Sequence, residues 1–236
     1  KMFWLLKFFL VILALYIAIF IFRKIPALSN LVIKVHKFTE AEKASVKGKV
    51  IVVTGGTDGI GKIFVQEMHK NQAIVIFSGR SIEKAKEVFR ELGISFEDKG
   101  TEIVSKDSKL VFRQIFQDDL DSVQGFVTFV KKWLGSNDLE RIDYLFNNAG
   151  LLGTKYSKTK QGFEMNQGVN FVSHVVITDG FVELLKKSSD PRMVITSSHA
   201  HKFAKFEKIS LIGTEGEGDF SRYGASKLAC SVYAKI

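Results

Sequence analysis

The sequence predicts an α/β fold in which a doubly wound parallel sheet follows an N-terminal transmembrane helix. Beyond residue 49, short apolar runs alternate with longer amphipathic segments, and this alternation is typical of strand–helix–strand units. A glycine-rich turn follows the first apolar run, and residues 2–22 are almost entirely apolar. The 236 residues therefore divide into a transmembrane anchor at 1–24, a basic juxtamembrane tether at 25–48 and one folded domain at 49–236.

The segment from Met2 to Phe22 has the length and composition of a membrane-spanning helix. Its 21 residues contain one charge, Lys7, and a helix of that length covers the roughly 30 Å of a bilayer's hydrocarbon core. Lys7 lies near one end, where its stem can reach the headgroups, and Trp4 suits the membrane interface. A cleavable signal peptide and a buried core helix are the alternatives, although a helix that is apolar all round has no core to enter beside so small a domain.

Positive charge is concentrated at the front of the chain. Residues 1–50 hold nine lysines and arginines against two acids, which accounts for most of the net charge of +9. A basic juxtamembrane segment beside a nearly neutral body favours an anionic membrane surface over nucleic acid as the partner. The positive-inside rule then places the domain on the cytoplasmic side. We expect the endoplasmic reticulum membrane, with the mitochondrial inner membrane as the alternative.

The few cysteines and histidines give no sign of a metal site. Cys230 is the single cysteine, so an intrachain disulfide and a cysteine-based metal cluster are excluded. His199 and His201 form the one close pair of histidines and lack an acidic or cysteine partner at ligand spacing. The sequence therefore predicts no bound metal.

Five strands and four connecting helices are expected in the body of the chain. Short runs rich in β-branched residues predict strands at 50–54, 73–77, 110–116, 143–146 and 193–196. Amphipathic segments between them, joined by right-handed crossovers that cover both faces of the sheet, predict helices at 60–70, 82–92, 122–134 and 161–187. The long polar stretch 93–109 is expected to be an irregular surface insertion.

A glycine-rich turn lies between the first strand and the first helix. It reads TGGTDGIG over 54–61. Glycines let a backbone turn tightly and approach a pyrophosphate, whose charge the N-terminus of the following helix favours. An ordinary glycine turn is the alternative, but the spacing in a strand–turn–helix context favours a dinucleotide loop. The residues expected to contact the cofactor are Gly55, Thr57, Asp58, Gly59, Ile60 and Gly61.

The end of the second strand indicates which dinucleotide binds. Arg80 stands at the position where an acid would bind the adenosine ribose hydroxyls. A guanidinium instead offers a fixed fork of donors to a 2′-phosphate. The sequence therefore predicts NADP(H) as the cofactor, with a solvated arginine at a helix start as the alternative.

The glycine turn resembles the T-G-x-x-x-G-x-G fingerprint of the short-chain dehydrogenase/reductase family, whose members contain a Rossmann-type sheet. The NNAG segment at 147–150 is similar to the family turn that closes over the cofactor and braces the sheet. The family's Asp-Leu pair, which touches the adenine, is matched at 119–120. Asp118 precedes it, so an alignment shifted by one residue is the alternative. The resemblance thus adds to the expected cofactor contacts Asp119, Leu120, Asn147, Ala149 and Gly150.

The same resemblance implies a catalytic set of four residues, Asn170, Ser198, Tyr223 and Lys227. Hydride transfer to a carbonyl carbon leaves an alkoxide that must receive a proton, and Tyr223 is the natural donor. A free phenol has a pKa of about 10 and a neighbouring ammonium favours its phenolate. The Y-x-x-x-K spacing puts Tyr223 and Lys227 on the same face of one helix. By resemblance, Tyr223 and Lys227 also contact the cofactor, Ser198 binds the substrate oxygen and Asn170 positions a water.

The resemblance covers residues 47–236 and ends before the C-terminal part of the family's fold. Thirteen residues follow Tyr223, so the family's last strands and its substrate-covering segment are missing from this chain. We expect a fragment of a longer protein; a reduced member that has lost part of its pocket is the alternative. The long interval between Ser198 and Tyr223 is similar to that of membrane-associated retinol dehydrogenase-like members, which implies a lipophilic substrate such as a retinoid, a steroid or a long-chain carbonyl.

Two functions are compatible with these patterns. The first is a membrane-anchored, NADP-dependent oxidoreductase that acts on a lipophilic carbonyl or alcohol, which the complete catalytic set favours. The second is a noncatalytic, dehydrogenase-like accessory subunit of a larger membrane complex, which the early end and the single anchor favour. The chain is expected to act as a homodimer or as a subunit of such an assembly.

Overall fold

The computed structural model describes residues 39–152, 155–205, 209–213 and 216–235. The chain divides into a unit at 1–43 and a unit at 44–236. The first unit is described from Thr39 onward, where a short helix, α3 (Glu40–Ala44), begins. The predicted spanning helix at Met2–Phe22 and most of the tether lie outside the described residues, so both stay predictions.

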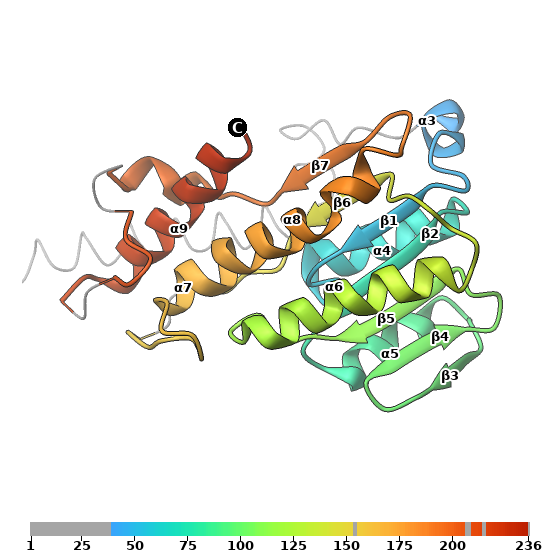
Figure 1. Cartoon of the computed structure of the whole chain (residues 1–236), viewed down its shortest axis with the longest axis horizontal. Helices are drawn as coiled ribbons and strands as arrows, with labels where there is room; N and C mark the ends of the chain where they lie inside the picture. Colours follow the sequence, from blue (N-terminus) through green and yellow to red (C-terminus); the bar gives the residue numbers. More distant parts are fainter. Residues whose placement is uncertain (1–38, 153–154, 206–208, 214–215, 236) are drawn as a thin grey trace, which may run out of the picture. The chain divides into compact units, whose positions relative to one another are not determined.

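A twisted sheet with the strand order β3-β4-β5-β2-β1-β6-β7 forms the centre of the second unit (Figure 1). Five of these strands run parallel and confirm the predicted ones: β1 (Val50–Val53), β2 (Ile74–Gly79), β5 (Leu110–Gln114), β6 (Tyr144–Asn147) and β7 (Arg192–Ile195). The order reverses at β1, which lies between β2 and β6. Ligands of doubly wound sheets bind at such a switch point, beyond the carboxyl ends of the strands.

The prediction of an irregular insertion at 93–109 is wrong. This segment contains β3 (Phe96–Asp98) and β4 (Glu102–Ser105), which extend the sheet antiparallel to β5. Ile103 pairs with Phe112 and is fully buried, while the exposed residues of β3, Glu97 and Asp98, are acidic. A turn at Gly100, which has a positive φ of 80°, reverses the chain between the two strands. Edge strands this short and polar lack the apolar run that predicts a strand.

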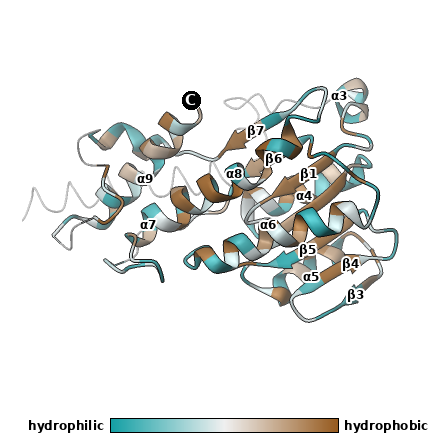
Figure 2. Cartoon of the chain, viewed as in Figure 1, coloured by the Kyte–Doolittle hydropathy of each residue, from teal (hydrophilic) through white to brown (hydrophobic). Residues whose placement is uncertain are grey.

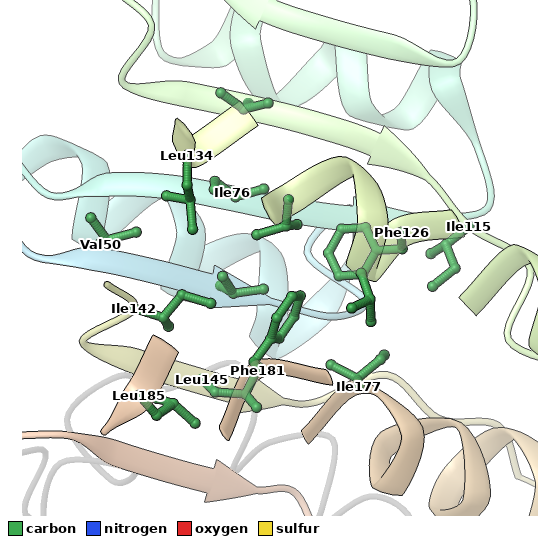
Figure 3. Packing of buried hydrophobic residues seen from close by; sticks show 14 of the residues in the cluster. Val50, Ile76, Ile115, Phe126, Leu134, Ile142, Leu145, Ile177, Phe181 and Leu185 are labelled. Atoms are coloured by element: carbon green, nitrogen blue, oxygen red, sulfur yellow. The ribbon is translucent and has the colours of Figure 1, made fainter. Parts of the chain in front are cut away.

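Helices cover both faces of the sheet, as the doubly wound prediction requires. Val50 and Val52 of β1 pack against α6 (Leu120–Gly135) and α8 (Ser173–Leu185); Figure 3 shows this cluster around Phe126 and Phe181. On the other face, the alternate residues of the same strand pack beside α4 (Gly59–Lys70) and α5 (Ile82–Glu91). The central strands are accordingly apolar, while the helices carry both apolar and polar faces (Figure 2).

The helix predicted at 161–187 is observed in three successive parts. It begins as α7 (Met165–Gln167), passes through a π-helical turn, η1 (Gly168–Val172), and continues as α8. In the described part of the chain, this helix at Met165–Leu185 is the one that is long and apolar enough to cross a membrane, and half of its apolar window is buried inside the fold. A core helix satisfies the same criterion, and packing against the sheet identifies it as one.

The last described elements lie beyond β7. A short 3₁₀ helix, η2 (His199–Phe203), follows this strand, and α9 (Asp219–Tyr233) ends the described chain. Two residues of β7, Met193 and Val194, are 38% and 52% exposed, so this strand is less covered than the other parallel strands. Helix α9 packs against η2, α7 and η1, and its Lys227 contacts the segment after β7 and lies near Gly150 in the turn after β6.

Candidate active site

The glycine turn after β1 has a geometry that only glycine permits at two positions. Gly55 has a φ of 66°, and a Cβ there would lie 2.8 Å from the Cα of Ala149. A Cβ on Gly61 would overlap the carbonyl oxygen of Gly55. The first turn of α4 therefore packs directly on the loop, and the N-terminus of this helix, which favours an anion, lies beside the loop.

The NNAG turn after β6 is bonded to this loop. The hydroxyl oxygen of Thr54 accepts hydrogen bonds from the backbone N–H groups of Asn148 (2.9 Å) and Ala149 (3.1 Å). The Asn148 amide donates in return to the carbonyl oxygens of Thr54 and Gly55, both at 3.2 Å. Asn147 points the other way and donates to the Thr178 hydroxyl on α8 at 2.9 Å. The two loops thus form one rigid floor at the switch point.

A cavity of about 530 Å³ opens above this floor. Among the residues predicted to contact the cofactor, those that line it are Gly55, Thr57, Asp58, Gly59, Arg80, Ala149 and Gly150. The other predicted contacts are not in its lining: Ile60, Gly61, Asp119, Leu120, Asn147, Tyr223 and Lys227. The lining also includes Gln117, Asp118 and Asn148, which the sequence had not singled out as contacts. The floor and cavity fit a dinucleotide, because close glycine approaches, a helix N-terminus and a nearby guanidinium meet there.

The segment after β5 places the acidic residues differently from the expected register. Asp119 is the N-cap of α6, accepts a hydrogen bond from the backbone N–H of Asp121, and pairs with Lys160 at 3.0 Å. The hydrogen bond from Lys160, aided by the Gln161 amide, lowers the pKa of the Asp119 carboxyl. Its neighbour Asp118 lines the cavity. The alignment shifted by one residue is therefore the one that places an acidic residue at the site.

Two charged residues, Arg80 and Asp58, line the cavity beside the glycine loop. Arg80 is exposed at the end of β2, where its carbonyl oxygen accepts a hydrogen bond from the Gln114 side chain at 2.9 Å. Asp58 is the N-cap of α4 and pairs with Lys84 at 2.5 Å. The hydrogen bond from Lys84, followed by one from the backbone N–H of Gly59, lowers the pKa of Asp58. The ammonium of Lys84 offsets the carboxylate, which otherwise would repel a phosphate at this helix N-terminus.

Helix α9 supplies the predicted tyrosine and lysine. Lys227 is 3% exposed, and its Nζ donates to the carbonyl oxygen of Thr196 at 2.8 Å. This ammonium lies 5.8 Å from the centre of the Tyr223 ring. Burial lowers the pKa of Lys227. A Cβ on Gly150 would lie 3.3 Å from Lys227 Nζ and 3.2 Å from Asn170 Oδ1, so the NNAG turn meets both predicted residues at the edge of the cavity.

Asn170 lies in the π-helical turn and has its side chain fully bonded. Its Oδ1 accepts from the backbone N–H of Leu151 at 2.8 Å, and its Nδ2 donates to the carbonyl oxygen of Leu151 at 3.0 Å. The same Nδ2 donates to Ser226 Oγ at 2.9 Å. A π turn widens a helix and is frequent at functional sites. Here it directs Asn170 between the chain after the NNAG turn and α9.

Ser198 follows β7 and begins η2. Its Oγ accepts from the backbone N–H of Ala200 at 3.2 Å, and its carbonyl oxygen lies 2.6 Å from His201 Nδ1. The adjacent Ser197 donates from its hydroxyl to the carbonyl oxygen of Lys227 at 2.9 Å. The serine pair is therefore attached to the helix that carries Tyr223 and Lys227.

The sequence reasoning missed His174, which lies beneath the site. Its Nδ1 is 3.0 Å from the carbonyl oxygen of Asn170, and its Nε2 is 3.0 Å from the Thr54 hydroxyl and 3.1 Å from the Gln117 amide nitrogen. A carbonyl oxygen can only accept, so Nδ1 carries the proton and Nε2 accepts. Burial lowers the pKa of His174 to about 4. The one available signal was its position four residues after Asn170, on the same helix face.

Comparisons with known proteins agree with this geometry. The family model for short chain dehydrogenases matches residues 49–235. The mouse (Mus musculus) protein retinol dehydrogenase 12 is 31% identical over 190 residues, which cover 80% of this chain and 56% of the relative. Human retinol dehydrogenase 11 is 33% identical over 182 residues, 77% of this chain and 53% of the relative. The chain thus spans about half the length of the curated relatives it matches.

Solved structures share the fold. The oxidoreductase yciK from Escherichia coli is 22% identical, with a TM-score of 0.59 over 84% of this chain and 72% of that one. A protein from Escherichia coli CFT073 assigned to the short chain dehydrogenases, solved in complex with NADPH, is 23% identical, with a TM-score of 0.58 over 81% of this chain and 70% of its own. With the family model spanning nearly all of the folded domain, this chain belongs to the short-chain dehydrogenase family.

Proposed function

We propose that the protein is a membrane-anchored oxidoreductase that transfers hydride between NADP(H) and a carbonyl/alcohol pair on a lipophilic substrate. The observation that supports this most directly is the meeting of Lys227 and Asn170 at Gly150, on the edge of the cavity above the glycine loop. A noncatalytic subunit would need the fold and the loop. It would have no use for an ammonium and an amide held at the same edge, with a phenol ring 5.8 Å from that ammonium.

The residues around the cavity suit a dinucleotide with an extra phosphate. The loop and the N-terminus of α4 suit the pyrophosphate, and both Gln117 and Asp118, in the segment after β5, line the same cavity. Arg80, which is exposed at the cavity, is the group suited to a 2′-phosphate. When bound, this cofactor supplies or accepts the hydride.

Side chains of the protein carry out the proton transfer that accompanies hydride transfer. Tyr223 donates a proton to the substrate oxygen in reduction and accepts it in oxidation, which is the general acid–base step. Lys227 stands 5.8 Å from the tyrosine ring, where its ammonium favours the phenolate electrostatically. Ser198 donates a hydrogen bond to the substrate oxygen. Asn170, which holds the Leu151 backbone on both sides, positions a water that passes the proton onward.

The substrate and the membrane are inferred together. The relatives matched at 77–80% of this chain are named retinol dehydrogenases, and retinol is a long apolar alcohol. The segment Met2–Phe22 is apolar over 21 residues, which suits a protein that takes its substrate from a bilayer. We infer single-pass anchoring in the endoplasmic reticulum membrane, with the domain in the cytoplasm and either a homodimer or a subunit of a membrane assembly as the functional form.

An assay with the natural full-length protein in detergent micelles tests the proposed function. Retinol and decanol serve as lipophilic probes, glycerol as a hydrophilic one, and NADP⁺ and NAD⁺ are compared with each. The proposal predicts oxidation of at least one lipophilic alcohol, faster with NADP⁺, and no turnover of glycerol. Tight NADPH binding without turnover of either lipophilic probe, in oxidation or in reduction of the matching aldehydes, would contradict it and favour the accessory subunit.

A further inference from the structure

A buried ion pair joins the two helices that carry the predicted catalytic residues. Arg222 precedes Tyr223 on α9, and Glu164 is the N-cap of α7, six residues before Asn170. Arg222 Nε lies 3.5 Å from Glu164 Oε1, and the two side chains are 2% and 1% exposed. Charges are costly to bury, so such a pair is weak evidence for stability and is better explained by a requirement for one geometry.

The Glu164 carboxylate is fixed from its own side. The Asn166 amide donates to Oε1 at 2.8 Å, and the backbone N–H of Gln167 donates to Oε2 at 2.9 Å. The backbone N–H of Glu164 donates to the carbonyl oxygen of Leu211 at 2.8 Å. The carboxylate therefore presents a fixed acceptor to α9, at the start of the helix that leads into the π turn.

The Arg222 guanidinium connects that acceptor to the beginning of α9. It donates to the carbonyl oxygen of Glu217 and to the Asp219 carboxylate, and it lies over the Tyr156 ring, 5.6 Å from the ring centre. Helix α9 begins at Gly218 without a side-chain cap. The planar fork of Arg222 thus links the chain that enters the helix, the first helical turn and α7 in one rigid unit.

Tyr223 is attached to this unit at two points. Successive residues of a helix point about 100° apart because a turn contains 3.6 residues, so Arg222 enters the interior while Tyr223 stays half-buried beside it. One turn later, Ser226 donates to the carbonyl oxygen of Tyr223 at 2.7 Å and accepts from Asn170 at 2.9 Å. The backbone of Tyr223 is therefore held on both sides against the helix that carries Asn170.

We propose that the Arg222–Glu164 ion pair is a positioning device that sets the place of the Tyr223 hydroxyl relative to Asn170 and the cavity. This inference rests on the proposed function, in which Tyr223 is the proton donor. Neither Arg222 nor Glu164 lines the cavity, and the contacts of both lead to the start of α9 and to α7, so we assign them a positioning role through Tyr223.

The test replaces the pair without leaving a lone buried charge. Arg222→Met together with Glu164→Gln removes both charges at once, and the glutamine oxygen can still accept from the backbone N–H of Gln167. The matched control is Lys186→Met with Glu183→Gln, which removes a similar pair from the exposed surface of α8. All variants are made in the natural full-length protein, and circular dichroism confirms that each one folds.

Turnover and cofactor binding separate positioning from general damage. With retinol and NADP⁺, the buried-pair variant should turn over about ten- to a hundredfold more slowly, the size of effect that a small misplacement of a reacting group produces. Its affinity for NADPH should change by less than about twofold. In a Tyr223→Phe background, the same replacement should cause no further loss, because residues that act through one group are not additive.

Hydrogen–deuterium exchange supplies a readout that needs no substrate. Amides at 219–226 should exchange at least about tenfold faster in the buried-pair variant, while those of β1 and β2 keep their protection. Unchanged exchange at 219–226, or faster exchange with parental turnover, would overturn the positioning role. If Tyr223→Phe alone kept parental turnover, the proposed function would fail first, and the positioning role with it.

Discussion

Asn170 in the π-helical turn and Ser226 in α9 are joined by a 2.9 Å hydrogen bond from Nδ2 to Oγ. The same asparagine holds the backbone of Leu151 through both its N–H and its carbonyl oxygen. Three segments distant in sequence, after β6, within η1 and within α9, therefore meet on one amide side chain. Any change at this amide should affect the site and the stability of the fold together.

Replacement of Asn170 by alanine should lower both stability and turnover. The variant leaves the Leu151 N–H and carbonyl groups and the Ser226 hydroxyl without this partner, and unsatisfied groups of this kind cost about 1–3 kcal/mol each when they stay buried, less where water reaches them. We expect a loss of about 2–4 kcal/mol in the free energy of unfolding, measured in urea. A variant that lost turnover with parental stability would show that Asn170 does not brace these segments.

The buried imidazole of His174 should make stability depend on pH. Its folded pKa of about 4 lies below the unfolded value of about 6.5. Between pH 6.5 and pH 4 this imidazole is therefore mostly protonated in the unfolded chain and mostly neutral in the folded chain. Stability is therefore lost as the pH falls from 6.5 toward 4. Between pH 7 and pH 5 this group alone should contribute a fall of about 2 kcal/mol.

Urea unfolding at these two pH values, compared between the parent and His174→Asn, isolates that contribution. The variant is expected to be less stable at both pH values, because it loses the bonds to Thr54 and Gln117. Its fall in stability between pH 7 and pH 5 should be smaller than the parental fall by about 2 kcal/mol. Equal falls would mean that His174 takes up its proton in the folded state.

Arg80 should decide between the two nicotinamide cofactors. Its charge-assisted hydrogen bonds to a 2′-phosphate contribute about 1.5–3 kcal/mol, so Arg80→Ala should weaken NADPH binding roughly ten- to a hundredfold. Binding of NADH should change little. Arg90→Ala, on an exposed position of α5, is the matched control. Fluorescence titration measures both affinities, and equal affinities in the parent protein would refute the choice of NADP(H).

The membrane segment predicts a defined orientation. With Met2–Phe22 spanning the bilayer and the basic residues after it on the cytoplasmic side, the folded domain should be digested by protease added to sealed, cytosol-facing-out vesicles. Opening the vesicles with detergent should change nothing. Protection of the domain in intact vesicles would contradict the cytoplasmic orientation.

Local sequence signals predicted the parts of the site that depend on neighbouring residues. The glycine turn, the NNAG segment and the strand–helix alternation each require particular residue types at fixed spacing, and the structure places them at the switch point. The β3–β4 hairpin was missed because its outward side chains are polar at a sheet edge. Asp119 was favoured over Asp118 because Leu120 follows it and completes the family's Asp-Leu pair, whereas in the structure Asp119 is the N-cap of α6 and Asp118 lines the cavity.

Long-range relationships could not be read from the sequence. Arg222 and Glu164 are 58 positions apart, and neither lies in a motif that indicates an ion pair. His174 stands in an apolar helix, and its position four residues after Asn170 indicates its helix face but not its partners. Both contacts depend on how α9 and α8 pack against the loops, which is a property of the assembled fold.

Single-turnover oxidation by Tyr223→Phe tests the central claim most directly. The variant keeps the ring but removes the phenol oxygen that accepts the proton of the alcohol, so retinol oxidation in the full-length protein preloaded with NADP⁺ should slow by about 10² to 10⁴. Affinity for NADPH should stay within about twofold of the parental value. A rate near that of the parent would contradict the account, because hydride transfer would then proceed without the acid–base group that this site is proposed to hold.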